Sequence, residues 1–503
     1  MVFLPGVFVL ILNKRSAVSY QLSAKTEAYS HCQKVFPLRE AYKEMLLKSP
    51  FEKGGFSTTT LSVDTEFLLC KHIGMERDEL IEARSRLEAF LTPLLPLLGR
   101  AERRRWGAFY IQGALLEGGR KTAAKMAAHY GGDVQALQQF VNQSPWDWQA
   151  LRQALAQQML AATGPGGAWV LDDTGFPKKG QHSVGVARQY SGTLGKIGNC
   201  QVAVSLNYAT GEGCFPVDFQ LYLPQSWIDE PRRRAKAGIP TDVTFRPKWR
   251  LGLEMLDQAR EWGLPIGVVV ADAAYGVVTE LRQALCERGY LYVMGVSPEL
   301  TVWTEAVAPT DPPYGGRGRR PTWKRALPKP LKLPEVAHGL PDEAWREITW
   351  RPGTKGPMQG RFAALRVQPS PGYYHGKVTE PVCWLLMEWP TGTAEPAKYW
   401  FSSLPETASL QELVYWAKIR WWVEQNYQQL KDELGLDHFE GRSWQGWHHH
   451  VTLIMIAFDF LVLEGFRAKK NYWVDPPTCQ AGTPTHAFNH AWFLPLLSSL
   501  NIH

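Results

Sequence analysis

A series of short apolar segments between residues 168 and 296 restricts the fold most, because two of these segments end in aspartate. Residues 168–173 (AWVLDD) and 266–272 (IGVVVAD) have the composition of buried strands. Two further strand-like segments, 200–209 and 214–224, lie between them and are separated by a glycine-containing turn. We therefore expect a sheet in which two strands end in carboxylates.

Helices enter this pattern after the first three strands. Residues 246–263 and 277–289 have helical character, and each precedes a strand-like segment, 266–272 or 290–296. Three strands in a meander, followed by alternating helices and strands, is the order of an RNase H-like sheet, and such alternation favours a mixed sheet. The predicted fold class is therefore α/β, with an RNase H-like mixed sheet and flanking helices.

The rest of the chain is arranged around this predicted core. A chain of 503 residues is too long for one compact domain, so several units are expected. The predicted parts are a poorly defined leader (1–75), an N-terminal helical domain (76–163), the first part of the core (164–299), a β-rich insertion (300–400), the helical part of the core (401–470) and a tail (471–503).

The predicted helical domain is basic. It contains Arg103, Arg104 and Arg105 in one segment and Arg120 and Lys121 in another, and the whole chain has a formal net charge of +7 and a pI of about 8.9. Short helices with tight turns and clustered basic residues are typical of helix-turn-helix DNA-binding units. A helical bundle with a solvated basic face is the alternative reading of the same pattern.

The cysteines and the two most apolar segments bear on location. The chain has 7 cysteines, none at CxxC spacing, so a zinc site or disulfide framework is not expected and a reducing cytoplasm fits best. Residues 1–13 have no basic residue ahead of the apolar run, unlike a signal peptide. Residues 451–466 are short for a membrane span and contain Asp459, which favours a buried core helix and no membrane association.

Asp173 and Asp272 close the two apolar strands. Ligands of open α/β sheets bind at the carboxyl ends of strands, and neighbouring buried carboxylates imply a cation. All-oxygen ligands favour Mg²⁺ or Mn²⁺ over Zn²⁺. Neighbours on a strand point to opposite faces, so only one of Asp172 and Asp173 is expected to be a ligand. Either strand-terminal aspartate could instead cap a helix.

A third acidic position lies on a helix within residues 418–436. The helix has an apolar stripe suited to packing on the sheet, formed by Ile419, Val423, Leu430 and Leu434. A second stripe, about 100° away, contains Arg420, Glu424, Tyr427 and Lys431. Glu424 would bind metal, and Arg420 and Lys431 would meet phosphate oxygens. A solvated face with i,i+4 ion pairs is the alternative.

Three segments carry a resemblance to a known family. They read WVLDDTGFPKKGQHSVGVARQYSGTLGK, VVADAAYG and YWAKIRWWVEQNYQQLKDELGLDHFEGRSWQGWHHH. These segments resemble the catalytic blocks of DDE transposases from bacterial insertion sequences, most of all the insertion-sequence 701 group, which is related to the insertion-sequence 4 group. By position, the family's aspartates fall on Asp173 and Asp272 and its glutamate on Glu424. Ala417 replaces the tyrosine expected on the glutamate helix.

The resemblance implies a DDE transposase, a polynucleotidyl transferase and endonuclease that cleaves and rejoins DNA by two-metal phosphoryl transfer. Asp173 and Asp272 would share one of two Mg²⁺ or Mn²⁺ ions, and Glu424 would complete the second site. The β-rich insertion would precede this catalytic glutamate. The implied partners are double-stranded DNA (terminal inverted repeats and target) and a second copy of the chain. The implied location is the nucleoid in a bacterial cytoplasm.

Further basic residues are candidates for contacts with the DNA backbone. Lys178 and Lys179 follow the first aspartate in a Pro-Lys-Lys-Gly turn, and Arg188 comes shortly after. We predict DNA contacts for these three and for Arg420, Lys431, Arg120 and Lys121, with ordinary exposed side chains as the alternative. The consecutive histidines at 448–450 point in three directions on a helix, so they cannot chelate one ion together.

Two other functions compete with this prediction. A glycosidase also uses paired carboxylates and aromatic residues, but it acts without a metal and gives no reason for Arg420 and Lys431 to share a face with Glu424. A catalytically inactive or domesticated transposase, acting only as a DNA-binding protein, would keep the fold and lose cleavage. A divalent-metal strand-cleavage assay separates both from an active transposase.

Overall fold

One mixed sheet organises the computed structural model, which describes residues 77–116, 118–307, 314–319, 329–353, 356–370 and 380–474. The predicted leader and nearly all of the predicted tail lie outside these residues. The sheet has 12 strands in the order β2-β3-β1-β5-β6-β12-β11-β10-β7-β8, with β4 on β3 and β9 on β10. The strands are β1 (Ala168–Pro177), β2 (Ala187–Ser191), β3 (Lys196–Ala209), β4 (Cys214–Leu221), β5 (Val268–Ala271), β6 (Leu291–Val296), β7 (Thr301–Trp303), β8 (Leu331–Lys332), β9 (Arg346–Gly353), β10 (Gly356–Pro369), β11 (Cys383–Glu388) and β12 (Lys398–Ser402).

The centre of the sheet has the predicted mixture of strand directions. β1 pairs antiparallel with β3 and parallel with β5, and β5 pairs parallel with β6. The expected α/β class, with a mixed sheet and flanking helices, is therefore confirmed. β5 ends at Ala271, opposite Leu171, whereas β1 continues on β3 to Pro177, so the prediction that Asp173 closes the first strand is wrong.

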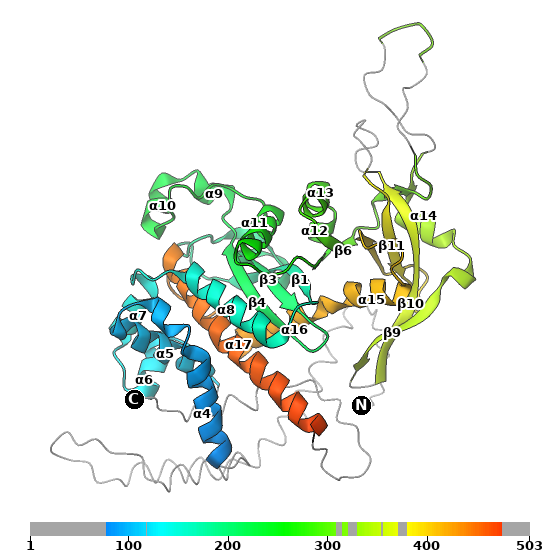
Figure 1. The fold of residues 1–503 in the computed structure, drawn as a ribbon. Coiled ribbons are helices and arrows are strands. Elements are labelled where there is room, and N and C mark those ends of the chain that lie inside the picture. The colour runs from blue at the N-terminus through cyan, green and yellow to red at the C-terminus, as the bar shows by residue number, and fades with distance from the viewer. Residues whose placement is uncertain are drawn as a thin grey trace, which may run out of the picture. The chain divides into compact units, whose positions relative to one another are not determined.

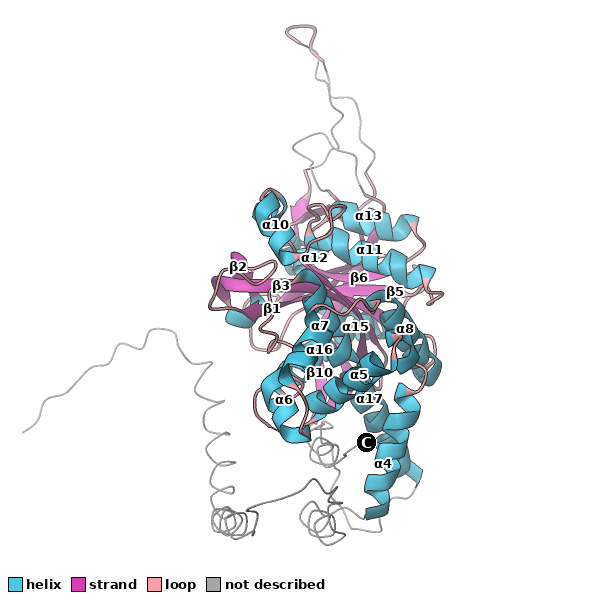
Figure 2. Cartoon of the chain, turned by 90° about the vertical axis from the view of Figure 1, so that its left-hand side faces the viewer, coloured by secondary structure: helices cyan, strands magenta, loops and turns pink. Residues whose placement is uncertain are grey.

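Helices cover both faces of the sheet, as Figure 2 shows. One face carries α10 (Pro231–Ala237), α11 (Lys248–Glu261), α12 (Ala273–Gly276) and α13 (Thr279–Glu287). The other face carries α15 (Leu410–Ile419), α16 (Trp421–Asp432) and α17 (Trp444–Val474). The remaining helices are α4 (Arg77–Leu91), η2 (Leu95–Leu98), α5 (Ala101–Leu115), α6 (Ala123–Tyr130), α7 (Val134–Asn142), α8 (Trp148–Thr163), η3 (Gly192–Leu194), α9 (Gln225–Ile228), α14 (Leu333–His338) and η4 (Asp342–Ala344).

The strand-rich segment that follows β6 continues the same sheet. β12 pairs antiparallel with β6, with Tyr399 opposite Val296, and β11 and β10 follow in order. In Figure 1 these strands extend the sheet away from α11 and α17. The chain thus leaves the central strands after β6 and returns through β12 to α15, so the segment precedes Glu424 as expected. The boundaries predicted for the β-rich insertion, residues 300 and 400, remain predictions.

α17 joins the N-terminal helices to the sheet, because it packs on α5, α7 and α8 as well as on β4. All residues from 451 to 460 are buried, which confirms the prediction of a core helix over 451–466. Within the described part of the chain, no helix combines the length and apolarity that crossing a membrane requires.

Two kinds of polar contact hold α17 in place. His449 lies with its ring nitrogens 2.9 Å from the Val141 carbonyl and 3.0 Å from the Trp146 carbonyl, while His450 contacts the Tyr110 hydroxyl at 2.7 Å. Consecutive histidines therefore reach different partners, as helical geometry requires. They fasten α17 to the N-terminal helices.

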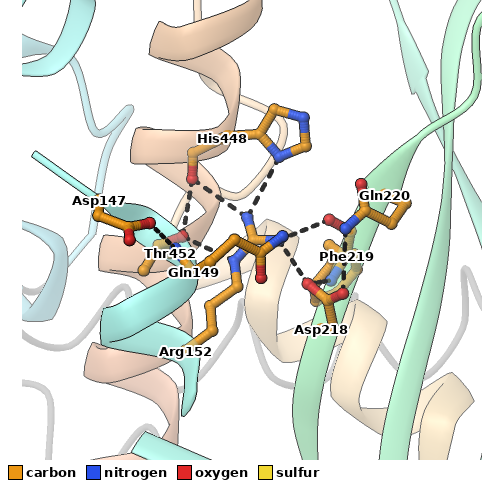
Figure 3. Close-up of polar contacts among 8 residues, drawn as sticks. All are labelled: Asp147, Gln149, Arg152, Asp218, Phe219, Gln220, His448 and Thr452. Atoms are coloured by element: carbon orange, nitrogen blue, oxygen red, sulfur yellow. Dashed lines mark hydrogen bonds and ion pairs between the residues drawn. The ribbon is translucent and has the colours of Figure 1, made fainter. Parts of the chain in front are cut away.

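The second contact is a buried network centred on Arg152 of α8 (Figure 3). Its guanidinium donates to Asp218 Oδ1 of β4 at 2.5 Å and to Thr452 Oγ1 of α17 at 2.8 Å. It also donates to the carbonyls of Phe219 and His448, at 2.7 and 3.2 Å. Arg152 has 0% exposed surface. A buried guanidinium loses its hydrogen bonds to water, and these protein acceptors replace them.

Candidate active site

Asp172, Arg420 and Glu424 form a chain of ion pairs beside the middle of β1, just beyond the part of this strand that pairs with β5. Arg420 Nη1 lies 2.6 Å from Asp172 Oδ2, and Arg420 Nη2 lies 2.7 Å from Glu424 Oε1. Asp172 is 7% exposed, whereas 64% of the Glu424 side chain is exposed. One guanidinium therefore links a buried carboxylate on the sheet to an exposed carboxylate on α16.

The junction of α15 and α16 places this guanidinium. Arg420 ends α15 and precedes α16 with a helical backbone (φ −57°, ψ −24°), so Glu424 follows it one helical turn later. Ile419 and Val423 are buried in one cluster with Val170 of β1. The prediction that this apolar stripe packs on the sheet is confirmed, and this packing directs Arg420 toward Asp172 of β1.

Asp272 follows β5 and caps α12. Its Oδ1 accepts hydrogen bonds from the amides of Ala274 at 2.9 Å and Tyr275 at 3.4 Å. Among the described residues no hydrogen bond to Oδ2 is formed, so capping uses only one of the two oxygens. α12 sits tightly on β6 because Gly276 has no side chain: a Cβ there would overlap the carbonyl oxygen of Gly295.

The surroundings of Asp172 make its charge costly. Burial raises the pKa of Asp172 to about 7; Arg420 opposes this shift, and the carboxylates of Asp272 and Asp173 add to it. Tyr427 of α16 lies nearby, with its hydroxyl 2.5 Å from Ser205 Oγ. Its side chain is half-buried, and desolvation of the phenol together with the charge of Asp172 raises its pKa well above the usual value.

Asp173 lies on the other face of the sheet. Its Oδ2 forms an ion pair with the ammonium group of Lys248, the first residue of α11. Leu171, two residues earlier on β1, lies against the same helix: a Cβ on Gly252 of α11 would be 3.2 Å from the Leu171 side chain. The structure therefore brings Asp172 to Arg420 and Glu424, and it brings Asp173 to Lys248.

A sequence profile described as DDE superfamily endonuclease matches residues 93–357, more than half of the chain. The chain belongs to this family of DDE endonucleases. The matched region contains the aspartates at 172, 173 and 272 and ends before Glu424.

One curated relative and one solved structure are similar to parts of this chain. The probable transposase for insertion sequence element IS701 of Microchaete diplosiphon is 33% identical over 159 residues, which are 31% of this chain and 39% of that protein. The match thus spans about two fifths of that relative. The piggyBac transposase in a cryo-EM structure of a synaptic complex with hairpin DNA has 12% identity and a TM-score of 0.39, over 86% of this chain and 79% of that one. The resemblance to DDE transposases of insertion sequences is confirmed by the family and the IS701 relative.

The carboxylates of this DDE endonuclease are suited in part to a divalent cation. Among the described residues, no three His, Cys, Asp or Glu side chains lie close enough together to hold a metal ion. Asp172 and Asp272 nevertheless offer the hard oxygen ligands that Mg²⁺ prefers, and Asp272 Oδ2 is free of hydrogen bonds in this part of the chain. Arg420 already supplies a positive charge between Asp172 and Glu424. A bound divalent cation would replace Arg420 in neutralising these two carboxylates.

Besides Arg420, three of the basic residues predicted to contact DNA have ammonium groups that donate to backbone carbonyls. Lys431 donates to the Gly175 carbonyl at 3.0 Å, and Lys178 donates to the Phe439 carbonyl at 2.8 Å. Burial lowers the pKa of each ammonium group to about 8. Lys121 is buried and donates to the carbonyls of Leu116 and Gly118.

The other predicted DNA contacts are more accessible. Lys179 and Arg188 are exposed, and Arg120 is exposed while pairing with Glu440 at 2.9 Å. Arg120 also borders a cavity of about 370 Å³ beside α6, where Lys125 and His129 contribute further basic groups. Four basic residues of the helical unit therefore line one hollow: Arg120, Lys121, Lys125 and His129.

Sequence reasoning missed several residues of this site. Lys248, Ser205 and Tyr275 were not singled out, because nothing local marks a lysine at a helix start or a serine within a strand as part of a site. Their place follows from β1 pairing with β3, which sets Asp172 opposite Ser205, and from α11 packing on the sheet. Because side chains alternate along a strand, only one of Asp172 and Asp173 can face α16. The sequence does not indicate which face of the sheet α16 covers, so it does not show which of the two it is.

Proposed function

We propose that the chain is an active DNA transposase of an insertion sequence, with an RNase H-like core that cleaves DNA strands and transfers them to a target. One observation carries the proposal: in a DDE endonuclease, Asp172 lies on β1 just beyond its pairing with the parallel strand β5, Asp272 follows β5, and Arg420 ties Glu424 to Asp172. Metal-assisted phosphoryl transfer uses carboxylates of this kind as metal ligands.

The proposed metal ligands come from three elements. One carboxylate of the Asp172–Asp173 pair lies within β1, Asp272 follows β5, and Glu424 projects from α16. Two Mg²⁺ or Mn²⁺ ions, when bound, would polarise the scissile phosphate and favour deprotonation of the attacking hydroxyl. Arg420 would then be released to hold a phosphate oxygen through its fork of N–H donors.

We further propose that DNA lies across the carboxyl ends of β1 and β5. Lys179 and Arg188 are exposed near β1, and Arg120 lies with the basic cavity of the helical unit. Lys178, Lys431 and Lys121 could contact phosphates only by exchanging their present bonds to carbonyls. The proposed DNA is the terminal inverted repeats and the target. Pairing of two ends favours a homodimer on DNA, in the bacterial cytoplasm at the nucleoid.

A strand-cleavage assay on element ends in Mg²⁺ tests this function. Asp272→Asn should reduce cleavage by about a thousandfold or more, because a metal ligand is lost, while binding to end DNA stays within a few-fold. Asp229→Asn, an exposed carboxylate outside the site, is the matched control and should cleave normally. End binding by the wild-type chain without any cleavage would show the inactive, DNA-binding alternative instead. Cleavage that persists in EDTA would exclude the metal mechanism.

A further inference from the structure

We propose that the ribbon formed by β2 and the first residues of β3 contacts DNA bases beside the candidate active site, through Tyr190 and Ile197. The inference rests on the proposed function and adds contacts to bases, whereas the basic residues discussed above would contact phosphates. Both side chains are large and apolar, yet they are 61% and 60% exposed. Single exposed apolar residues are common on protein surfaces, but a contiguous exposed group marks a candidate contact surface.

The β2–β3 ribbon, residues 187–200, projects beyond the rest of the sheet. β2 is the terminal strand, and it pairs with residues 196–200 of β3. β1 and β4 pair with β3 only from Cys200 and Ala203 onward, so within the described chain residues 196–199 pair with β2 alone. Figure 2 shows β2 at the outer end of the sheet. The ribbon is therefore two strands wide, and a two-stranded ribbon fits the major groove of B-DNA.

One face of the ribbon is covered and the other is open. On the covered face Ser191 is buried, and Leu194 lies so close to Gly198 that a Cβ there would be 2.6 Å from its side chain. Tyr190 and Ile197 lie opposite each other in the register, so their side chains share the other face. The exposed side chain of Arg188, two residues before Tyr190, lies on that face as well. This open face thus presents an adjacent apolar pair with a cation beside it.

The tip of the ribbon is fixed to β1 near the candidate active site. Thr193 Oγ1 donates to the Gly175 carbonyl at 3.2 Å, and a Cβ on Gly175 would overlap Ser191 Oγ. Lys431 of α16 donates to the same carbonyl at 3.0 Å and to Thr193 Oγ1 at 2.9 Å. Gly175 follows Asp173 by two residues, which is about 7 Å along a strand. DNA that reaches the carboxylates would therefore pass close to the ribbon.

The charge around the ribbon favours DNA over a second copy of the chain as the partner. Residues 174–211 contain no Asp or Glu, whereas the whole chain has 55 Lys and Arg against 48 Asp and Glu. The basic residues of this segment are Lys178, Lys179, Arg188 and Lys196. Two copies that met through this face would bring like charges together, while a DNA backbone is attracted by it.

The apolar pair is suited to bases, because a phosphate offers it no favourable contact. Apolar side chains inserted between base steps unstack them and bend the duplex, and an aromatic ring stacks on any base. Tyr190 would stack and Ile197 would act as a wedge, while Arg188 and the neighbouring lysines hold the backbone. The ribbon would thus stabilise an opened base step beside the cleaved phosphate.

Tyr190→Ser and Ile197→Ser test this role in the full chain on element-end DNA. With EDTA present, permanganate reactivity of thymines beside the cleavage site should rise when the wild type binds, and each variant should lose about half or more of that rise. Cleavage of fully paired ends in Mg²⁺ should fall by about tenfold in each variant. A mismatch at the opened step should restore cleavage to within about threefold, because that step is already unpaired. Tyr190→Phe keeps the ring and should cleave normally, and Ile81→Ser, another exposed isoleucine, is the matched control.

The outcomes separate this inference from the proposed function. Because both side chains are exposed, the thermal midpoint of each Ser variant should stay within about 2 °C of the wild type. Unchanged cleavage and thymine reactivity in both variants, or a loss of cleavage that mismatched ends do not rescue, would overturn the base contact while the wild type still cleaves. Normal thymine reactivity with weaker self-association in light scattering would assign the face to a second copy instead. A wild type that neither binds nor cleaves element ends would contradict the proposed function itself.

Discussion

Arg420 is the internal cation of the site. A guanidinium cannot lose its proton at physiological pH, and its fork of donors fits two carboxylates at once. It therefore stabilises Asp172 as an anion although burial disfavours that charge. The same contacts make Arg420 a competitor of any metal ion that uses Asp172 and Glu424.

Replacing Arg420 by Met should have opposite effects on stability with and without metal. Without metal, the buried Asp172 loses its partner, and the free energy of unfolding should fall by about 1–3 kcal/mol. Added Mg²⁺ binds only the folded protein and meets no competing cation, so it should raise the thermal midpoint more than in the wild type. Differential scanning fluorimetry with EDTA or Mg²⁺ measures both effects. A smaller Mg²⁺-induced shift than in the wild type contradicts the idea, and Arg288→Met, which breaks a pair with Asp257 elsewhere, is the control.

His450 makes stability depend on pH. Its neutral ring is satisfied, since Nδ1 can accept from the Tyr110 hydroxyl while Nε2 donates to the Leu436 carbonyl at 3.1 Å. Burial lowers the pKa of His450 to about 3, against about 6.5 for an unfolded histidine. Below pH 6.5 the unfolded chain gains a proton that the folded chain refuses, so this contribution is present above pH 6.5 and declines toward pH 3.

This residue alone should lower the free energy of unfolding by about 2 kcal/mol between pH 7 and pH 5. Urea denaturation at several pH values measures the slope. His450→Phe removes the titrating ring and keeps an aromatic group against Phe439, so its pH dependence should be flatter. An unchanged slope would mean that His450 is not the cause.

At the scale of elements, the strand pattern was predictable because it is local. The segments expected at 200–209 and 290–296 appear as β3 and β6, and the helix expected at 246–263 appears as α11. The sequence did not reveal that the helix around 418–436 breaks at Arg420, or that Asp272 starts the short helix α12. Both depend on packing against distant strands. The choice between Asp172 and Asp173 likewise depends on which face α16 covers, and no local pattern encodes that.

The Arg152 network links α8, β4 and α17 through buried polar groups, and it should be sensitive to the loss of one partner. Arg152→Met leaves Asp218 buried without its cation, so the free energy of unfolding should fall by about 3–5 kcal/mol. The double variant Arg152→Met/Asp218→Leu removes both charges, and it should be less destabilised than Arg152→Met alone. Chemical denaturation of the wild type, of Arg152→Met and Asp218→Leu, and of the double variant gives the comparison. A double variant that is as unstable as the sum of the single changes would show that the two residues act independently.

At the scale of the whole molecule, the N-terminal helices and the sheet share one core. α17, near the end of the described chain, packs on α5, α7 and α8 and also on β4, and the large apolar cluster runs through all of them. All described residues fall in one compact unit that begins at Phe67. The helical domain predicted at 76–163 is therefore attached to the proposed catalytic core through an extensive apolar surface.

A chain that begins at residue 164 should consequently fail to fold alone. It would expose the face of α17 that carries His449 and His450 and the partners of Arg152, and apolar surface of that extent drives aggregation. Expression of residues 164–503 should give insoluble protein, and co-expression with residues 77–163 should restore a soluble complex whose two pieces co-elute in gel filtration. A soluble 164–503 chain with a single cooperative unfolding transition would instead show that the helical part is an independent module. In that case the proposed DNA contacts of Arg120 could be separated from cleavage without loss of the fold.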